Sequence, residues 1–149
     1  MGGLAYATHF EDLRVYQKAK AVSRLVFEVS RAFPREELYS LTDQIRRASR
    51  SIGAQIAEAW AKRRYERHFV SKLTDADAEQ METQHWVGEA RDAGYLSAAD
   101  ADRIRLDLLE IGRMLNGMME KAHLFCKPPG RQVRESETEF FAPRSSTDR

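Results

Sequence analysis

The fold is decided by one stretch of the chain, residues 40–60, which reads SLTDQIRRASRSIGAQIAEAW. Apolar or small residues recur in it at positions 41, 45, 48, 52, 56 and 59, the spacing of one face of an α-helix. Small residues also occupy its other faces, so neighbouring helices can approach closely. Arginines stand at positions 46, 47 and 50. This stretch therefore predicts a helix that is both the packing centre of the fold and its most basic surface.

Three further helices are predicted around it. Asp12 is suited to cap a first helix that begins near Leu13, and Phe33-Pro34 ends that helix because a residue before proline leaves the α region. The central helix is expected over about residues 36–65, and carboxylates in its first turn favour a start there. Residues 62–68 contain no proline or glycine, so the second and third helices are expected to join through a tight, nearly helical corner.

The third and fourth helices have the clearest apolar stripes and the clearest turn between them. Gly94 is expected just past the end of the third helix, and Ser97 or Asp100 is expected to cap the fourth, which stops before Pro128. The first stripe holds Val15, Ala19, Val22, Val26, Val29 and Phe33; the third holds Phe69, Leu73, Ala76, Gln80, Thr83, Val87 and Ala90; the fourth holds Ile104, Leu108, Ile111, Leu115, Met118, Ala122 and Phe125.

Four amphipathic segments joined by short connections predict an all-α fold, an antiparallel up-down-up-down four-helix bundle with helices crossing near 20°. We expect a flexible N-terminal arm at residues 1–9, the bundle domain at 10–126 and a disordered C-terminal tail at 127–149. The alternative for Phe140-Phe141 in that tail is that this pair docks on a neighbouring molecule instead of being disordered.

The totals point to a cytoplasmic protein. The chain has 149 residues, a net charge of +1 and one cysteine, Cys126, so an intramolecular disulfide is impossible and a reducing compartment is expected. No apolar run approaches the roughly 20 residues of a membrane span, so a membrane is not an expected partner.

The near-neutral total conceals a charge asymmetry between consecutive helices. Residues 41–67 carry seven basic and three acidic side chains, whereas residues 68–94 carry two basic and six acidic ones. Arg46 and Arg64 are 18 residues apart, which is five helical turns, so one continuous helix would place them on a shared face with Arg50. The basic residues are Arg46, Arg47, Arg50, Lys62, Arg63, Arg64 and Arg67.

Three interpretations of this basic segment stay open. It is a phosphate-binding strip for RNA or DNA, a surface that pairs with the acidic third helix of a neighbouring subunit, or a solvated face with local ion pairs. Trp60 and Tyr65 lie among the cations and could stack on bases, although a tryptophan on a bundle helix is more often a core or interface anchor.

No catalytic, metal or cofactor site is predicted. Glu82 with His85, and Glu120 with His123, have the Glu-x-x-His spacing of di-metal bundles, but antiparallel helices would separate the two motifs by on the order of 25 Å. Glu58 is expected to be semi-buried and paired with an arginine, with a catalytic role as the alternative. Gln55 is expected to make an interhelical hydrogen bond.

Several segments together resemble a known family. They are FEDLRVYQKA at residues 10–19, FPREELYSLTDQIRRA at residues 33–48, Ser51-Ile52, Ile56-Ala57-Glu58, Glu82-Thr83-Gln84 and Gly94-Tyr95-Leu96. The chain is similar over residues 10–125 to the bacterial four-helix bundle proteins encoded in intervening sequences of large-subunit ribosomal RNA genes. Accessory proteins of diversity-generating retroelements belong to the same structural group.

The resemblance implies a four-helix bundle that assembles as a ring-shaped homopentamer. In the retroelement branch it implies binding to nucleic acid and to a reverse transcriptase. The family usually has Asn-Ile-Ala-Glu-Gly where this chain has Gln55-Ile56-Ala57-Glu58-Ala59. The leading functional hypothesis is thus a non-enzymatic bundle that binds nucleic-acid phosphates through the basic residues named above, and the alternative is a protein-interaction scaffold.

Overall fold

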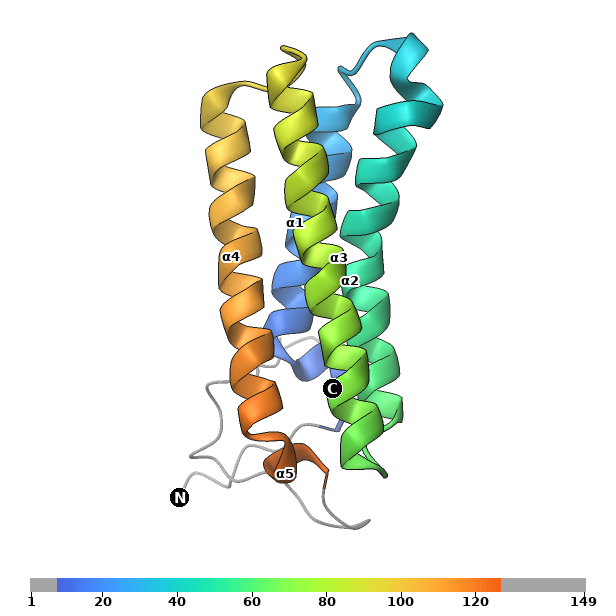
Figure 1. Cartoon of the computed structure of the whole chain (residues 1–149), viewed down its shortest axis with the longest axis vertical. Coiled ribbons are helices and arrows are strands. Elements are labelled where there is room, and N and C mark those ends of the chain that lie inside the picture. The colour runs from blue at the N-terminus through green and yellow to red at the C-terminus, as the bar shows by residue number, and fades with distance from the viewer. Residues whose placement is uncertain (1–7, 127–149) are drawn as a thin grey trace, which may run out of the picture.

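The computed structural model describes residues 8–126, which form helices and turns with no strand. Four long helices lie side by side, and successive connections alternate between the two ends of the bundle (Figure 1). They are α1 (Arg14–Ser30), α2 (Asp43–Ala61), α3 (Glu66–Asp92) and α4 (Ala98–Glu120), followed by the short α5 (Ala122–Phe125). Each helix packs on the next, and α1 also packs on α4. The predicted all-α bundle is confirmed.

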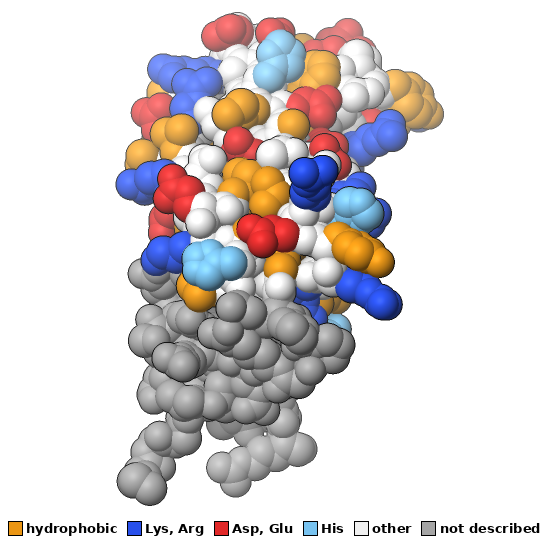
Figure 2. Space-filling view, turned by 60° about the horizontal axis from the view of Figure 1, so that its bottom comes forward, with side chains coloured by type: hydrophobic (Ala, Val, Ile, Leu, Met, Phe, Trp, Pro, Cys, Tyr) orange, Lys and Arg blue, Asp and Glu red, His pale blue; other side chains and the backbone are white. Residues whose placement is uncertain are grey.

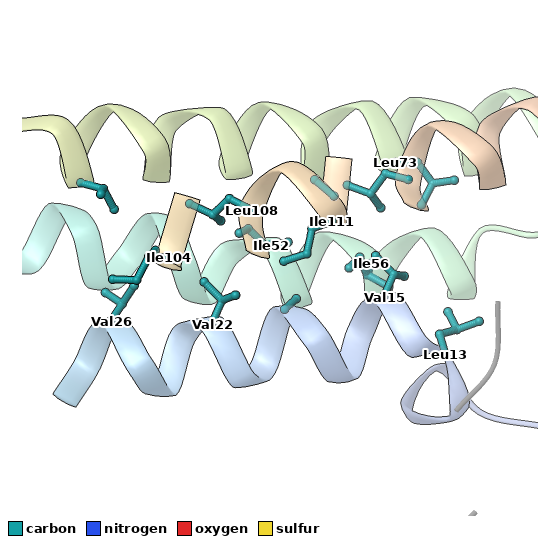
Figure 3. Close-up of a cluster of buried hydrophobic side chains, with 14 of the residues drawn as sticks. Leu13, Val15, Val22, Val26, Ile52, Ile56, Leu73, Ile104, Leu108 and Ile111 are labelled. Atoms are coloured by element: carbon teal, nitrogen blue, oxygen red, sulfur yellow. The ribbon is translucent and has the colours of Figure 1, made fainter. Parts of the chain in front are cut away.

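The core is the meeting line of the four predicted stripes. Every position of the predicted second, third and fourth stripes is buried. The first stripe is buried too, except for Val29, which is half-buried. Figure 3 shows Val22, Ile52 and Leu108 pointing from different helices into one cluster. Burying a side chain of this size stabilises the fold by about 1.5–3 kcal/mol relative to exposure. The helical spacing therefore has a direct energetic cause.

The start of α1 differs from the prediction. Leu13 is the N-cap of α1 and makes no side-chain cap. Asp12 instead ends a single 3-10 turn, η1 (Phe10–Asp12), where its carboxylate accepts hydrogen bonds from the backbone N–H groups of Thr8 and His9. The expectation that Asp12 caps α1 is wrong because the preceding turn already uses its carboxylate. Apart from Thr8 and His9, the expected arm and tail, including Phe140-Phe141, lie outside the described residues.

The predicted second helix, 36–65, is divided into three pieces. A 3-10 turn, η2 (Arg35–Glu37), and a π-helical segment, η3 (Leu38–Thr42), precede α2. Residues 62–65 then form the expected tight corner, with Lys62 donating to the carbonyl oxygens of Glu58 and Ala59 before Tyr65 becomes extended. The corner uses no positive φ angle, which is why it needs no glycine.

Both predicted signals at the α3–α4 turn are present. Gly94 has a φ angle of +80°, and the amides of Gly94 and Tyr95 bond back to the carbonyl oxygens of Arg91 and Ala90. This is the Schellman arrangement that favours glycine. Ser97, rather than Asp100, caps α4: its Oγ accepts a hydrogen bond of 3.1 Å from the amide of Asp100.

The small residues of α2 partly do what the sequence predicts. Ala48 and Ala59 are buried against neighbouring helices, whereas Ala54 is exposed. Tyr16 of α1 packs over Gly53, where a Cβ atom would lie 3.4 Å from Cε2 of the ring.

None of the helices in residues 8–126 is long and apolar enough to cross a membrane.

Candidate nucleic-acid interface

Three guanidinium groups gather around one exposed aromatic ring. Phe27, on α1, is 36% exposed. The guanidinium carbons of Arg46, Arg50 and Arg31 lie 4.7, 5.6 and 5.9 Å from its ring centroid. We call Phe27, Arg31, Arg46 and Arg50 the Phe27 cluster. Each contact is a cation–π interaction, so the ring holds three like charges close together at a site where α1 meets α2.

Arg46 is also fixed by a hydrogen bond between helices. Its Nε donates to Ser30 Oγ over 2.8 Å, and Ser30 Oγ donates in turn to the carbonyl oxygen of Phe27 over 3.0 Å. Ser30 is buried, so these two hydrogen bonds connect the half-buried Arg46 to the core. The remaining guanidinium N–H groups of Arg46 are not used by any residue in the described part of the chain.

Within residues 8–126, neither Arg46 nor Arg50 lies within ion-pair distance of a carboxylate. Other interhelical cations are neutralised. Lys18 on α1 contacts Glu110 at 2.8 Å and Asp107 at 3.4 Å on α4, and its pKa is raised, chiefly by the hydrogen bond to Glu110. Arg31, a member of the Phe27 cluster, faces Glu28 of its own helix at 3.7 Å. Within the Phe27 cluster, Arg46 and Arg50 thus keep cationic charge that no carboxylate in residues 8–126 compensates.

Glu58 and Gln55 serve the α2–α3 interface. Lys72 Nζ lies 2.9 Å from Glu58 and donates a 3.5 Å hydrogen bond to Gln55 Oε1. The hydrogen bond with Lys72 lowers the pKa of Glu58. The predicted interhelical role of Gln55 is confirmed. The prediction for Glu58 is wrong in two respects, because its side chain is exposed and its partner is a lysine of α3 rather than an arginine.

Arg47 also reaches the side of α2 that faces α3. It lines a small surface hollow together with Glu79 and Glu82 of α3. Burial raises the pKa of Glu79, its hydrogen bond and charge repulsion with Glu82 raise it further, and the charge of Arg47 opposes this shift. The charge of Arg47 therefore offsets the acidic charge of Glu79 and Glu82 on α3.

The other four predicted cations lie near the α2–α3 corner. Lys62, Arg63 and Arg64 follow the end of α2 at Ala61, and Arg67 is in the first turn of α3. The premise that one continuous helix carries both Arg46 and Arg64 is wrong, because α2 ends at Ala61. The seven predicted cations therefore do not lie on one continuous helix.

Trp60 is an anchor in the core rather than an exposed stacking surface. It is 8% exposed, and Arg63 covers its outer side with the guanidinium carbon 3.5 Å from the ring centroid. Burial lowers the pKa of Arg63. Tyr65, in contrast, is 57% exposed.

The sequence did not reveal the contribution of α1 to this surface. Phe27 lies outside the predicted stripe of the first helix, and Arg31 is not among the seven predicted basic residues. A signal exists, because Phe27 and Arg31 are one helical turn apart and an arginine next to an off-stripe aromatic residue is suited to cover it. In the described residues, no three His, Cys, Asp or Glu side chains are arranged to hold a metal ion.

The surface beyond this cluster is mixed in charge. On the face shown in Figure 2, basic and acidic side chains alternate, and hydrophobic side chains are scattered between them. Charge is thus organised locally rather than over the whole molecule, in keeping with a net charge of +1.

Fold and surface define an all-α bundle in which Arg46 and Arg50, at the junction of the first two helices, have no carboxylate partner among residues 8–126. The family model described as 23S rRNA-intervening sequence protein matches residues 11–117, and the chain belongs to that family. It is also similar to the crystal structure of a protein of unknown function from the S23 ribosomal protein family of Bacteroides thetaiotaomicron. That similarity has a TM-score of 0.64 and 25% identity, over 71% of this chain and 95% of the other. A comparison with curated proteins gave no significant match.

Proposed function

We propose that the protein is a non-enzymatic, cytoplasmic nucleic-acid-binding bundle in which Arg46 and Arg50 contact phosphates of RNA or DNA. The observation that supports this is that both guanidinium groups are held around Phe27 without a carboxylate partner in the described residues. The name of the family, which refers to a ribosomal RNA gene, is consistent with an RNA partner.

Arginine suits this role physically. Its planar guanidinium group matches two phosphate oxygens, and it releases counterions from the nucleic-acid backbone when it binds. Because Phe27 and Ser30 already restrict the arginines, less side-chain entropy is lost on binding than for free surface lysines. We expect a smaller contribution to phosphate binding from the other predicted cations. They are Arg47, Lys62, Arg63, Arg64 and Arg67.

The test is a filter-binding titration against a structured RNA at several salt concentrations. We expect the double variant R46A/R50A to lose at least about tenfold in affinity, and the slope of log K against log salt to fall by roughly 1.5–2 for two lost phosphate contacts. The matched control is R103A/R113A, which removes the same charge from exposed sites on α4. No affinity at low salt, or an equal loss in both double variants, contradicts the proposal.

Self-association is a second proposal, supported by exposed apolar side chains on the opposite part of the bundle. Leu106 and Leu109, one turn apart on α4, are 66% and 48% exposed, and Met81 on α3 is 58% exposed. Together with the family resemblance, they favour a homopentamer. Light scattering is expected to give five copies for the wild type and one for L106E/L109E. A monomeric wild type at all concentrations overturns this assignment.

The nucleic-acid proposal can be separated from the alternative of a scaffold without a nucleic-acid role, in which the arginines would make subunit contacts. In that case R46A/R50A would lower the molecular mass in solution and leave RNA binding absent.

A further inference from the structure

Tyr39 is an exposed aromatic side chain with an unusual backbone setting. It is 78% exposed, more than any other large hydrophobic side chain in residues 8–126. It lies in η3, the π-helical segment at the N-terminal end of α2, where the amide of Asp43 bonds to the carbonyl oxygen of Leu38. Leu41 and Thr42 of the same segment are buried, so the backbone that carries Tyr39 is anchored in the core. π-Helical turns are rare and frequently occur at functional sites.

This ring shares a surface depression with the arginines of α2. The depression has a volume of about 620 Å³, and its lining includes Tyr39, Asp43, Gln44, Arg46, Arg47 and Arg50. Tyr39 and Arg46 are seven residues apart, which corresponds to roughly 10 Å along the helix axis. One open hollow thus has an aromatic face at one end and guanidinium groups at the other.

The chemistry of this lining suits an unpaired nucleotide better than a peptide. Tyr39 is the one large hydrophobic side chain in the lining, so the site cannot bury an apolar peptide side chain on several sides. A nucleobase needs only a flat face for stacking, and its polar edges can bond to the amide of Gln44 or the carboxylate of Asp43. Asp43 repels phosphate, which favours placing the phosphates at Arg46 and Arg50 and the base at Tyr39.

We propose that Tyr39 is a stacking platform for an unpaired base, so that the depression binds single-stranded nucleic acid more tightly than a duplex. This inference rests on the proposed phosphate contacts of Arg46 and Arg50 and adds the class of substrate. A base inside a duplex cannot lay its face on Tyr39, because its neighbours in the stack cover it.

The test compares the full chain with its Y39A and Y39F variants by fluorescence anisotropy on a labelled 12-nucleotide single strand. RNA and DNA forms of this oligonucleotide and a 12-base-pair duplex form the arms of the experiment. For the single strand, we expect Y39A to weaken binding by about fivefold to a hundredfold, the range of one lost base–aromatic stack, and Y39F to stay within about twofold. Duplex binding and the salt slope are expected to be unchanged in Y39A. Quenching of a 2-aminopurine in the strand is expected for the wild type and Y39F only.

Y65A is the matched control, because Tyr65 is also exposed but lies at the far end of α2. Equal effects of Y39A on single strand and duplex, or a loss in Y39F as large as in Y39A, overturn the stacking role. If R46A/R50A weakens binding and Y39A does not, the phosphate contacts stand and only the stacking platform fails.

Discussion

The guanidinium group of Arg63 lies over the indole ring of Trp60, 3.5 Å from its centroid, and Arg63 Nε donates a 2.9 Å hydrogen bond to the carbonyl oxygen of the same residue. One side chain thereby closes the end of α2 in two ways. It shields the aromatic anchor from water, and it satisfies a terminal carbonyl group of the helix.

Replacing Arg63 is therefore expected to cost stability rather than binding. We expect R63A to lower the free energy of unfolding by about 1–2 kcal/mol, the size of a desolvated cation–π contact together with a lost hydrogen bond. R63K should lie between R63A and the wild type, because lysine keeps the charge without the planar group. Urea unfolding measures this. R64A, at an exposed neighbouring position, is the control and is expected to change stability by less than about 0.5 kcal/mol.

Three glycines are expected to respond differently to alanine. G94A should destabilise by about 1–2 kcal/mol, because Gly94 has a φ angle of +80°. G112A should destabilise by about 1–3 kcal/mol, because its Cβ would lie 3.0 Å from Nε2 of the buried Gln80. Gln80 is held in place by hydrogen bonds with Asp77 and Gln84. G53A should be neutral or stabilise by up to about 1 kcal/mol, because alanine favours the helix and Tyr16 leaves room. Destabilisation by G53A comparable to that by G112A would show that the packing against Tyr16 is tighter than described.

Cys126 predicts a loss of stability in alkaline solution. Burial raises its pKa from the ordinary 9.0 to about 11; the charge of Glu66 adds to this effect and that of Arg63 opposes it. Because the folded-state pKa is the higher one, the contribution of the thiol is complete below pH 9 and is lost as the pH rises through 11.

The free energy of unfolding of the wild type should accordingly fall by about 1 kcal/mol relative to C126A between those two pH values, since partial exposure reduces the full effect. Alkylation of the native thiol at pH 8 should be slower than in unfolded protein. Parallel stability curves for wild type and C126A would contradict the assignment.

Glu79 predicts an effect in the acidic range. Its pKa is raised, first by burial and then by Glu82, so its ionised form destabilises the fold at neutral pH. E79Q should therefore be more stable than the wild type at pH 7, by less than about 1 kcal/mol because solvent screens the pair. This advantage should disappear as the pH falls below the ordinary carboxylate value of 4.5. E89Q, at an exposed site on α3, is the control and should show a smaller change.

The sequence predicted what depends on local periodicity. The stripes of α3 and α4, from Phe69 to Phe125, are buried as expected, because helical spacing and the burial of apolar side chains require the same positions. Gly94 and Ser97 were found because a left-handed residue and an N-cap have strong residue preferences. The tight corner at 62–65 followed from the absence of proline and glycine.

What the sequence missed depends on geometry between segments. Asp12 has the right residue type for an N-cap, but the 3-10 turn before α1 uses its carboxylate. The 18-residue spacing of Arg46 and Arg64 assumed one continuous helix, but α2 ends at Ala61 although no proline or glycine marks that end. The Phe27 cluster needs the packing of α1 on α2, and the exposure of Tyr39 needs the π-helical segment; neither is encoded in a single periodic pattern.

The short corners have a kinetic consequence. Helices that are neighbours along the chain are also packed neighbours, so most interfaces form between nearby parts of the sequence. Such low-contact-order topologies fold in microseconds to milliseconds. The docking of α1 on α4 is different, because Lys18 and Glu110 are 92 residues apart and a large loop must close before they meet. The contact between α1 and α4 is therefore expected to form late in folding, and K18A should change the rate of unfolding more than the rate of folding.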